Sequence, residues 1–188
     1  MKQFACSVLL ITAACGSSAT SPVDATTVVT GDAPAGSNTV TGMVNGKGFT
    51  MAKSTFWVGS PDSPATDTVL YLFDATIACG DIVAAGWDTT IPAGTQILEL
   101  KMVGKTAMAY PTTTAPSHVP APGESLSSYT VAASTATDQI SSGGSVTLTT
   151  IESPGAGRFA TGSFHLTFPS GSLDGTFDAP FCMAGREP

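Results

Sequence analysis

Short bursts of alternating apolar and polar residues, separated by turn signals, fill the chain from Thr39 onward. Alternation with a period of two is typical of β-strands, because successive side chains of a strand point to opposite faces. No window of a dozen residues sustains the i, i+3, i+4 spacing of an amphipathic helix. Charged residues make up only 11% of the chain, well below the roughly 25% of a typical soluble protein, so long helices with charged outer faces are not expected. The sequence therefore predicts an all-β protein.

The individual strands have distinguishing features. Asn45-Gly46 favours a type I′ hairpin turn, because both positions of that turn have positive φ. The segment 67–75 is apolar on both faces, which places it in the middle of a sheet. In the segment 95–103, one face carries Leu98, Leu100 and Met102 and is the predicted core face, while Ile97, Glu99 and Lys101 lie on the other. The predicted strands are 39–44, 47–56, 67–75, 95–103, 127–134, 145–151, 158–168 and 172–181.

About eight short strands fit an antiparallel two-layer β-sandwich, and a closed β-barrel is the alternative. Near the end, the segment 162–168 (GSFHLTF) is echoed by 175–181 (GTFDAPF), and the residues between them have turn chemistry. We expect these copies to form the two arms of a hairpin with their phenylalanines facing inward.

The first residues have the pattern of a signal peptide. Lys2 gives a positive start, 4–11 is mostly apolar, and small residues precede Cys15. The apolar run is far shorter than the roughly 20 residues of a membrane-spanning helix. The pattern resembles that of bacterial lipoproteins, whose signal ends in a lipobox with a cysteine. The resemblance implies cleavage before Cys15, lipidation of Cys15, and anchoring in the outer membrane because Gly16 rather than Asp follows. A plain secretory signal is the alternative.

The resemblance extends to the ends of the folded part. The residues Gly42 to Gly46 with Phe49, and Gly175 to Cys182, look like the edges of uncharacterised lipoprotein β-domains, a family that implies no activity. The expected organisation is a signal peptide at 1–14, the lipidated cysteine and a flexible tether at 15–38, a β-sandwich domain at 39–184 and a tail at 185–188.

The cysteines fit the same compartment. Cys6 lies in the signal and Cys15 would carry lipid, which leaves Cys79 and Cys182. An exported protein with two remaining cysteines is expected to join them in a disulfide. The alternative, a metal site or a reactive thiol, lacks a CxxC pair or a neighbouring histidine.

Composition and motifs exclude several functions. The net charge is -7 and the seven Lys and Arg residues are scattered, so no nucleic-acid partner is expected. HExxH, P-loop, GxGxxG and EF-hand patterns are absent, so no metal or cofactor is expected. Asp74, Asp81 and Asp88 bracket Cys79, but their spacing matches no calcium loop, and we interpret them as solvated turn residues.

Three residues are candidates for contact with a partner. Trp87 follows a glycine in a predicted loop, where its ring could stack on a glycan. Tyr110 and His118 belong to the Pro- and Thr-rich stretch 110–125, which is too long for a simple turn. We assign no catalytic residue, because GxSxG is missing and His165 is expected on the polar face of a strand.

The leading functional hypothesis is a lipid-anchored envelope or surface protein whose non-catalytic domain binds a protein or a glycan. Its lipid would hold it to the membrane. One alternative is a lipid-anchored periplasmic or surface hydrolase, with a site assembled from His118 or His165, an aspartate and a serine. Another is a purely structural envelope component.

Overall fold

The computed structural model describes residues 38–49, 54–59, 67–83, 91–114, 119–134, 138–151 and 159–182. All of them lie in the second of two compact units, Gly31–Pro188. Among the described residues, no helix has the length and apolar content needed to cross a membrane.

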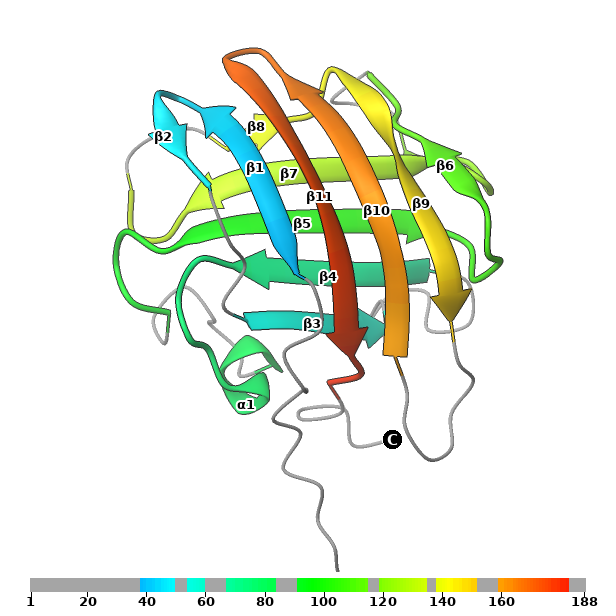
Figure 1. Cartoon of the computed structure of the whole chain (residues 1–188), viewed down its shortest axis with the longest axis horizontal. Helices are drawn as coiled ribbons and strands as arrows, with labels where there is room; N and C mark the ends of the chain where they lie inside the picture. Colours follow the sequence, from blue (N-terminus) through cyan, green and yellow to red (C-terminus); the bar gives the residue numbers. More distant parts are fainter. Residues whose placement is uncertain are drawn as a thin grey trace, which may run out of the picture. The chain divides into compact units, whose positions relative to one another are not determined.

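Two antiparallel sheets pack face to face in this unit, and their strands cross in the view of Figure 1. The strand order is β2-β1-β11-β10-β9-β6 in the six-stranded sheet and β3-β4-β5-β7-β8 in the five-stranded sheet. Each sheet ends in two different edge strands, so neither closes into a barrel. The predicted β-sandwich is confirmed.

The six-stranded sheet consists of β1 (Thr39–Val44), β2 (Lys47–Gly48), β6 (Ala109–Pro111), β9 (Gly143–Ile151), β10 (Phe159–Phe168) and β11 (Gly171–Pro180). The five-stranded sheet consists of β3 (Ser54–Gly59), β4 (Asp67–Phe73), β5 (Gln96–Val103), β7 (Ser125–Val131) and β8 (Gln139–Ile140). A short helix, α1 (Cys79–Val83), lies in the connection between β4 and β5.

One predicted strand is wrong. The segment 47–56 is split between β2, which pairs with β1, and β3, which pairs with β4 in the other sheet. Asn45 and Gly46 do have positive φ (53° and 71°), so the predicted hairpin turn is confirmed. The hairpin ends early because Phe49 is fully buried in the main core, where the chain leaves the six-stranded sheet.

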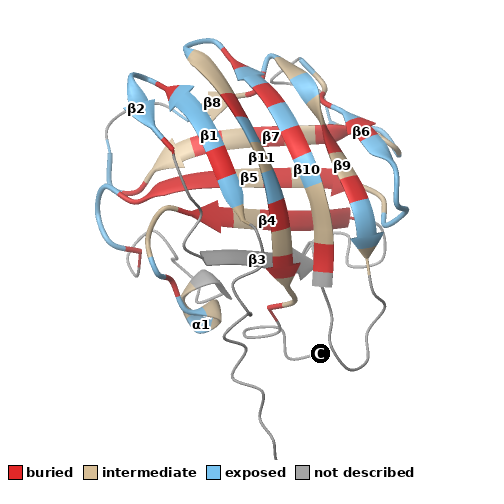
Figure 2. Ribbon diagram, viewed as in Figure 1, coloured by how far each residue is buried: buried red, intermediate tan, exposed pale blue. Residues whose placement is uncertain are grey.

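The main core lies between the two sheets. Buried and exposed residues alternate over 164–168 in β10 (Figure 2), as expected of a strand with one face in a core. Leu98, Leu100 and Met102 are fully buried in this core, which confirms the predicted core face of β5. In β4, Leu70 and Leu72 face the same core.

The echoed segments form the hairpin β10–β11, as predicted. Their register places Gly162 opposite Phe177 and Phe164 opposite Gly175. A Cβ atom on either glycine would lie 2.6 Å from the Cζ atom of the opposite ring. Each ring therefore lies across the backbone of the opposite glycine, a cross-strand arrangement that covers a glycine in a sheet with an aromatic side chain. The repeated Gly-x-Phe sequence is explained by this reciprocal packing.

A hydrogen-bonded network fixes the start of β5. The Tyr129 hydroxyl donates to Gln96 Oε1 (2.7 Å), and Gln96 Nε2 donates to Asp74 Oδ2 (2.8 Å) and to the Gly48 carbonyl (3.0 Å). The Gln96 N–H donates to Asp74 Oδ1 (2.8 Å). Each polar group of the Gln96 side chain thus has a partner, which a buried amide requires.

Replacing Tyr129 with Phe is expected to lower the free energy of unfolding by about 1–3 kcal/mol, because Gln96 Oε1 stays buried and loses its donor. Urea unfolding of the variant and the wild type measures the change. A loss below about 0.5 kcal/mol, the size expected of a neutral surface change, would contradict the importance of this network.

A second, smaller core covers the outer face of the five-stranded sheet. Phe73 and Ile97 point away from the main core, because they alternate with residues that face it. Around them pack Ile77, Ile91, Ala132 and Cys182. The connection between β4 and β5 therefore folds back over the outer face of its own sheet.

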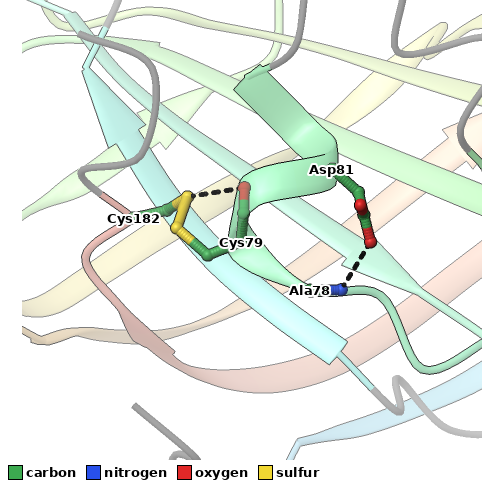
Figure 3. Close-up of a disulfide and its surroundings, with 4 residues drawn as sticks. All are labelled: Ala78, Cys79, Asp81 and Cys182. Atoms are coloured by element: carbon green, nitrogen blue, oxygen red, sulfur yellow. Dashed lines mark hydrogen bonds between the residues drawn. A yellow bond between two sulfur atoms is a disulfide. The ribbon is translucent and has the colours of Figure 1, made fainter. Parts of the chain in front are cut away.

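The predicted disulfide between Cys79 and Cys182 is confirmed and lies at this second core. Figure 3 shows that it joins the first residue of α1 to the segment just after β11. Asp81 accepts a hydrogen bond from the Ala78 N–H (3.2 Å, Figure 3), so its carboxylate caps the helix start. The disulfide thus links the end of the six-stranded sheet to the β4–β5 connection, which covers the outer face of the five-stranded sheet.

Candidate functional site

Of the three predicted contact residues, Tyr110 alone belongs to the described part of the chain, and it is buried. Tyr110 is only 1% exposed; its hydroxyl donates to the Thr106 carbonyl (2.8 Å) and accepts from the Thr106 N–H (3.0 Å). Its prediction as a surface contact is wrong, because its ring belongs to the main core. Trp87, His118 and the lipidation candidate Cys15 lie outside the described residues.

A pocket of about 380 Å³ lies on the outer face of the five-stranded sheet, over β5 and β7. That volume is near the lower end of the roughly 300–1,000 Å³ found for ligand pockets. One part of its lining is polar and the other is aliphatic. The lining residues are Ile91, Ile97, Glu99, Ser128, Thr130, Val131, Ala132, Ala133, Ser134 and Asp138.

The polar part of the pocket contains two carboxylates and several hydroxyls. Glu99 on β5 is directly opposite Ser128 on β7, and Ser128 Oγ donates a long hydrogen bond of 3.5 Å to Glu99 Oε2. Asp138, just before β8, accepts a hydrogen bond from Thr130 Oγ1. The antiparallel pairing of β5, β7 and β8 therefore brings the two acids to one cavity.

The surroundings of Glu99 disfavour its charged form. Burial raises the pKa of the Glu99 carboxyl, and the negative charge of Asp138 raises it further. Lys101 and the hydrogen bond from Ser128 oppose these effects without cancelling them. On the neighbouring strand, burial and the charge of Glu99 raise the pKa of Tyr71. Burial and the neighbouring acid therefore both favour the protonated form of Glu99.

The aliphatic part of the pocket depends on the second core. Ile91, Ile97 and Ala132 line the pocket and also pack in that core, which contains Cys182. Ile91 comes from the connection that the Cys79–Cys182 disulfide fastens. The disulfide-linked connection between β4 and β5 thus holds one wall of the pocket in place.

Glu99→Gln is expected to make the protein more stable than the wild type at pH 7. In the unfolded chain Glu99 titrates near its ordinary pKa of 4.5, and folding raises that pKa. The folded protein then binds the proton more tightly, so the contribution of Glu99 to stability falls as pH rises from about 4.5 through the folded-state pKa. The advantage of the variant should therefore disappear at about pH 4.

Chemical denaturation of both proteins between pH 4 and pH 8 tests this. Asp178→Asn changes the net charge equally on the six-stranded sheet and is the control. An advantage that is constant with pH, or that grows toward low pH, would contradict the buried character of Glu99.

A second group of polar residues lies on the outer face of the six-stranded sheet. Ser145, His165 and Asp174 are cross-strand neighbours in one row, and His165 Nδ1 is hydrogen-bonded to Asp174 Oδ1. The His165 and Asp174 side chains are 64% and 53% exposed, so His165 lies on the polar face as predicted. Backbone N–H groups of paired inner strands are used in the sheet, so the described strands around His165 provide no ready N–H donors for an oxyanion.

The aspartates around Cys79 have structural roles where the structure describes them. Asp74 accepts hydrogen bonds from Gln96, and Asp81 caps α1; Asp88 lies outside the described residues. Among the described residues, no group of three or more His, Cys, Asp or Glu side chains could hold a metal ion.

Sequence reasoning missed Glu99 and Asp138 as site residues. The alternation in β5 did place Glu99 on the face opposite the core, which was the available signal. No sequence signal pointed to Asp138, because this residue enters the pocket only through the pairing of β7 with β8.

Comparisons with protein-family models, curated proteins and solved structures found no match. Any function of the pocket must therefore be inferred from its own residues.

Proposed function

We propose that the chain is an exported, lipid-anchored protein of the outer membrane whose β-sandwich is a non-catalytic binding module. The pocket over β5 and β7 holds its ligand, which is a small group by itself or part of a protein or glycan. The observation that carries this proposal is the pocket itself, where a half-buried carboxylate, hydroxyls and aliphatic side chains converge. Such a mixture of polar and apolar lining is typical of ligand sites.

The disulfide supports the exported location. Disulfides form and persist in oxidising compartments and are rare in the cytosol. Cys79 and Cys182 are bonded, and Cys182 is buried in the second core. This agrees with the signal-like first residues and with the expected lipidation of Cys15.

A thermal-shift screen of the full chain against sugars, short peptides, amino acids and amines tests the binding function. A ligand that occupies the pocket should raise the melting temperature of the wild type. It should fail to do so in Ser128→Phe, which fills the pocket from β7. Ser163→Phe, on the outer face of the six-stranded sheet, is the matched control and should respond like the wild type. If no compound stabilises the protein, or if Ser128→Phe responds like Ser163→Phe, the pocket is not the binding site.

Intact-mass spectrometry of the membrane-extracted protein tests the anchor. The mass expected is that of a chain beginning at Cys15 with added acyl groups, and reduction should add two hydrogens for the disulfide. A soluble, unacylated form would overturn the lipid anchor.

The second candidate is a lipid-anchored hydrolase, which the row Ser145, His165 and Asp174 favours. His165 has the orienting aspartate of a general base, and the serine is directly opposite it. A fluorophosphonate probe should then label Ser145, and His165→Ala should abolish the labelling. Absence of labelling would remove this candidate.

A further inference from the structure

We infer that the pocket binds a primary ammonium group carried on a short aliphatic chain. The ammonium would lie between Glu99 and Asp138, and the chain would lie along Ile97 and Ile91. This inference rests on the proposed binding function and names the chemical class of its ligand.

The charged residues that line the pocket favour a positively charged ligand. Among the described residues that line it, two are carboxylates and none carries a positive charge. The nearest lysine on β5, Lys101, has its ammonium 3.5 Å from Asp67 Oδ2, so it already has a partner of its own. Two acids facing one cavity repel each other, and a cation between them would replace this repulsion with attraction to both.

The hydrogen bonding in the pocket also favours an ammonium ligand. Among the described residues, Glu99 accepts one hydrogen bond, and at 3.5 Å it is long compared with the usual range. A half-buried carboxylate normally has closer donors. An ammonium group has three N–H donors and accepts none, so it can donate to Glu99, to Asp138 and to a neighbouring hydroxyl. Charge-assisted bonds of this kind are the strong ones.

The aliphatic lining determines what carries the ammonium. Ile91 and Ile97 are almost fully buried and meet the pocket beside its polar part. A chain of methylenes attached to the ammonium would remove its own apolar surface from water by packing against these side chains. A ring covered with hydroxyls would not.

A metal ion fits the site less well. Calcium takes six to eight oxygen ligands, usually including several carboxylates. The described residues offer two carboxylates here and no cluster of three or more metal-ligating side chains. An organic cation needs fewer acceptors and uses the aliphatic wall.

Isothermal titration calorimetry of the full chain with n-pentylamine tests the inference. The comparison ligands are 1-pentanol, which has the same chain without the charge, glucosamine, which has the amine without the chain, N-acetyl-lysine methylamide, and Ca²⁺. We expect 1-pentanol and glucosamine to bind at least tenfold more weakly than pentylamine. Binding of the lysine derivative as tight as that of pentylamine would support the inference with a lysyl side chain as the source. Binding of pentylamine alone would support it with a free amine.

Two variants locate the binding. Glu99→Gln should weaken pentylamine binding at least tenfold, whereas Asp178→Asn should leave it unchanged although the net charge changes equally. A cation favours the ionised form of Glu99, so binding measured at decreasing pH should begin to release protons, and its enthalpy should then depend on the buffer. That dependence should be lost in Glu99→Gln, which a purely structural role of Glu99 would not explain.

The inference is overturned if 1-pentanol or glucosamine binds as well as pentylamine, if Glu99→Gln binds pentylamine normally, or if Ca²⁺ binds and the amines do not. When only uncharged compounds from the thermal screen occupy the pocket, the amine is excluded and the binding function stands. When nothing occupies the pocket, both fail.

Discussion

Replacement of Gly162 by Ala is expected to lower the free energy of unfolding by about 3 kcal/mol, the upper part of the range for overpacking a core. The added Cβ would lie 2.0 Å from the Thr147 carbonyl oxygen on β9 and 2.6 Å from the Phe177 ring on β11. Neither neighbour can yield freely, since one is backbone of a paired strand and the other is a ring buried in the main core. Urea unfolding measures the loss.

Two companion variants make this prediction specific. Gly143→Ala, on the adjacent strand, has nothing within 4 Å of the new atom and should change stability little. Gly162→Ala combined with Phe177→Leu should not recover the wild-type stability, because the contact with the Thr147 oxygen remains. If Gly162→Ala is no less stable than Gly143→Ala, the reciprocal packing of glycine and phenylalanine is wrong.

Loss of the disulfide is expected to lower the free energy of unfolding by about 2–5 kcal/mol, the range found when a native disulfide is removed from a small secreted domain. The bond joins residues 103 positions apart, so its removal frees a long loop in the unfolded chain. In the folded state, its removal also releases the connection between β4 and β5. This connection packs over Phe73 and Ile97 and forms one wall of the pocket. Denaturant unfolding of Cys79→Ala/Cys182→Ala gives the change.

Reduced wild-type protein is the matched comparison, because it keeps both sulfur atoms in the second core. Similar losses in the reduced protein and in the double variant would assign the effect to the cross-link rather than to a small cavity at Cys182. An unfolding midpoint that does not move on reduction would contradict a stabilising role for the bond.

Most of the sandwich could be predicted because its strands obey a local rule. The strands β5, β9, β10 and β11 each put one apolar face in the main core, and the alternation of Leu98, Leu100 and Met102 with polar neighbours is visible in the sequence. The disulfide followed from cysteine counting. The break between β2 and β3 could not be predicted, because an alternating pattern does not reveal that consecutive residues cross from one sheet to the other.

The alternation within strands could not predict the second core or the pocket. Ile77 and Ile91 come from a connection with no period, and they are buried only because that connection folds back over β4 and β5. Glu99 and Asp138 share a cavity only through strand pairing. Tyr110 was a poor guide for a related reason, since its ring fills the main core instead of facing a partner.

The most direct test of the pocket as the ligand site is a map of backbone amide shifts in the ¹⁵N-labelled full chain, recorded with the most stabilising compound of the thermal screen. We expect shifts at Ile97, Glu99, Ser128 and Asp138 that disappear in Ser128→Phe. Shifts confined to the outer face of the six-stranded sheet, around His165 and Asp174, would contradict it.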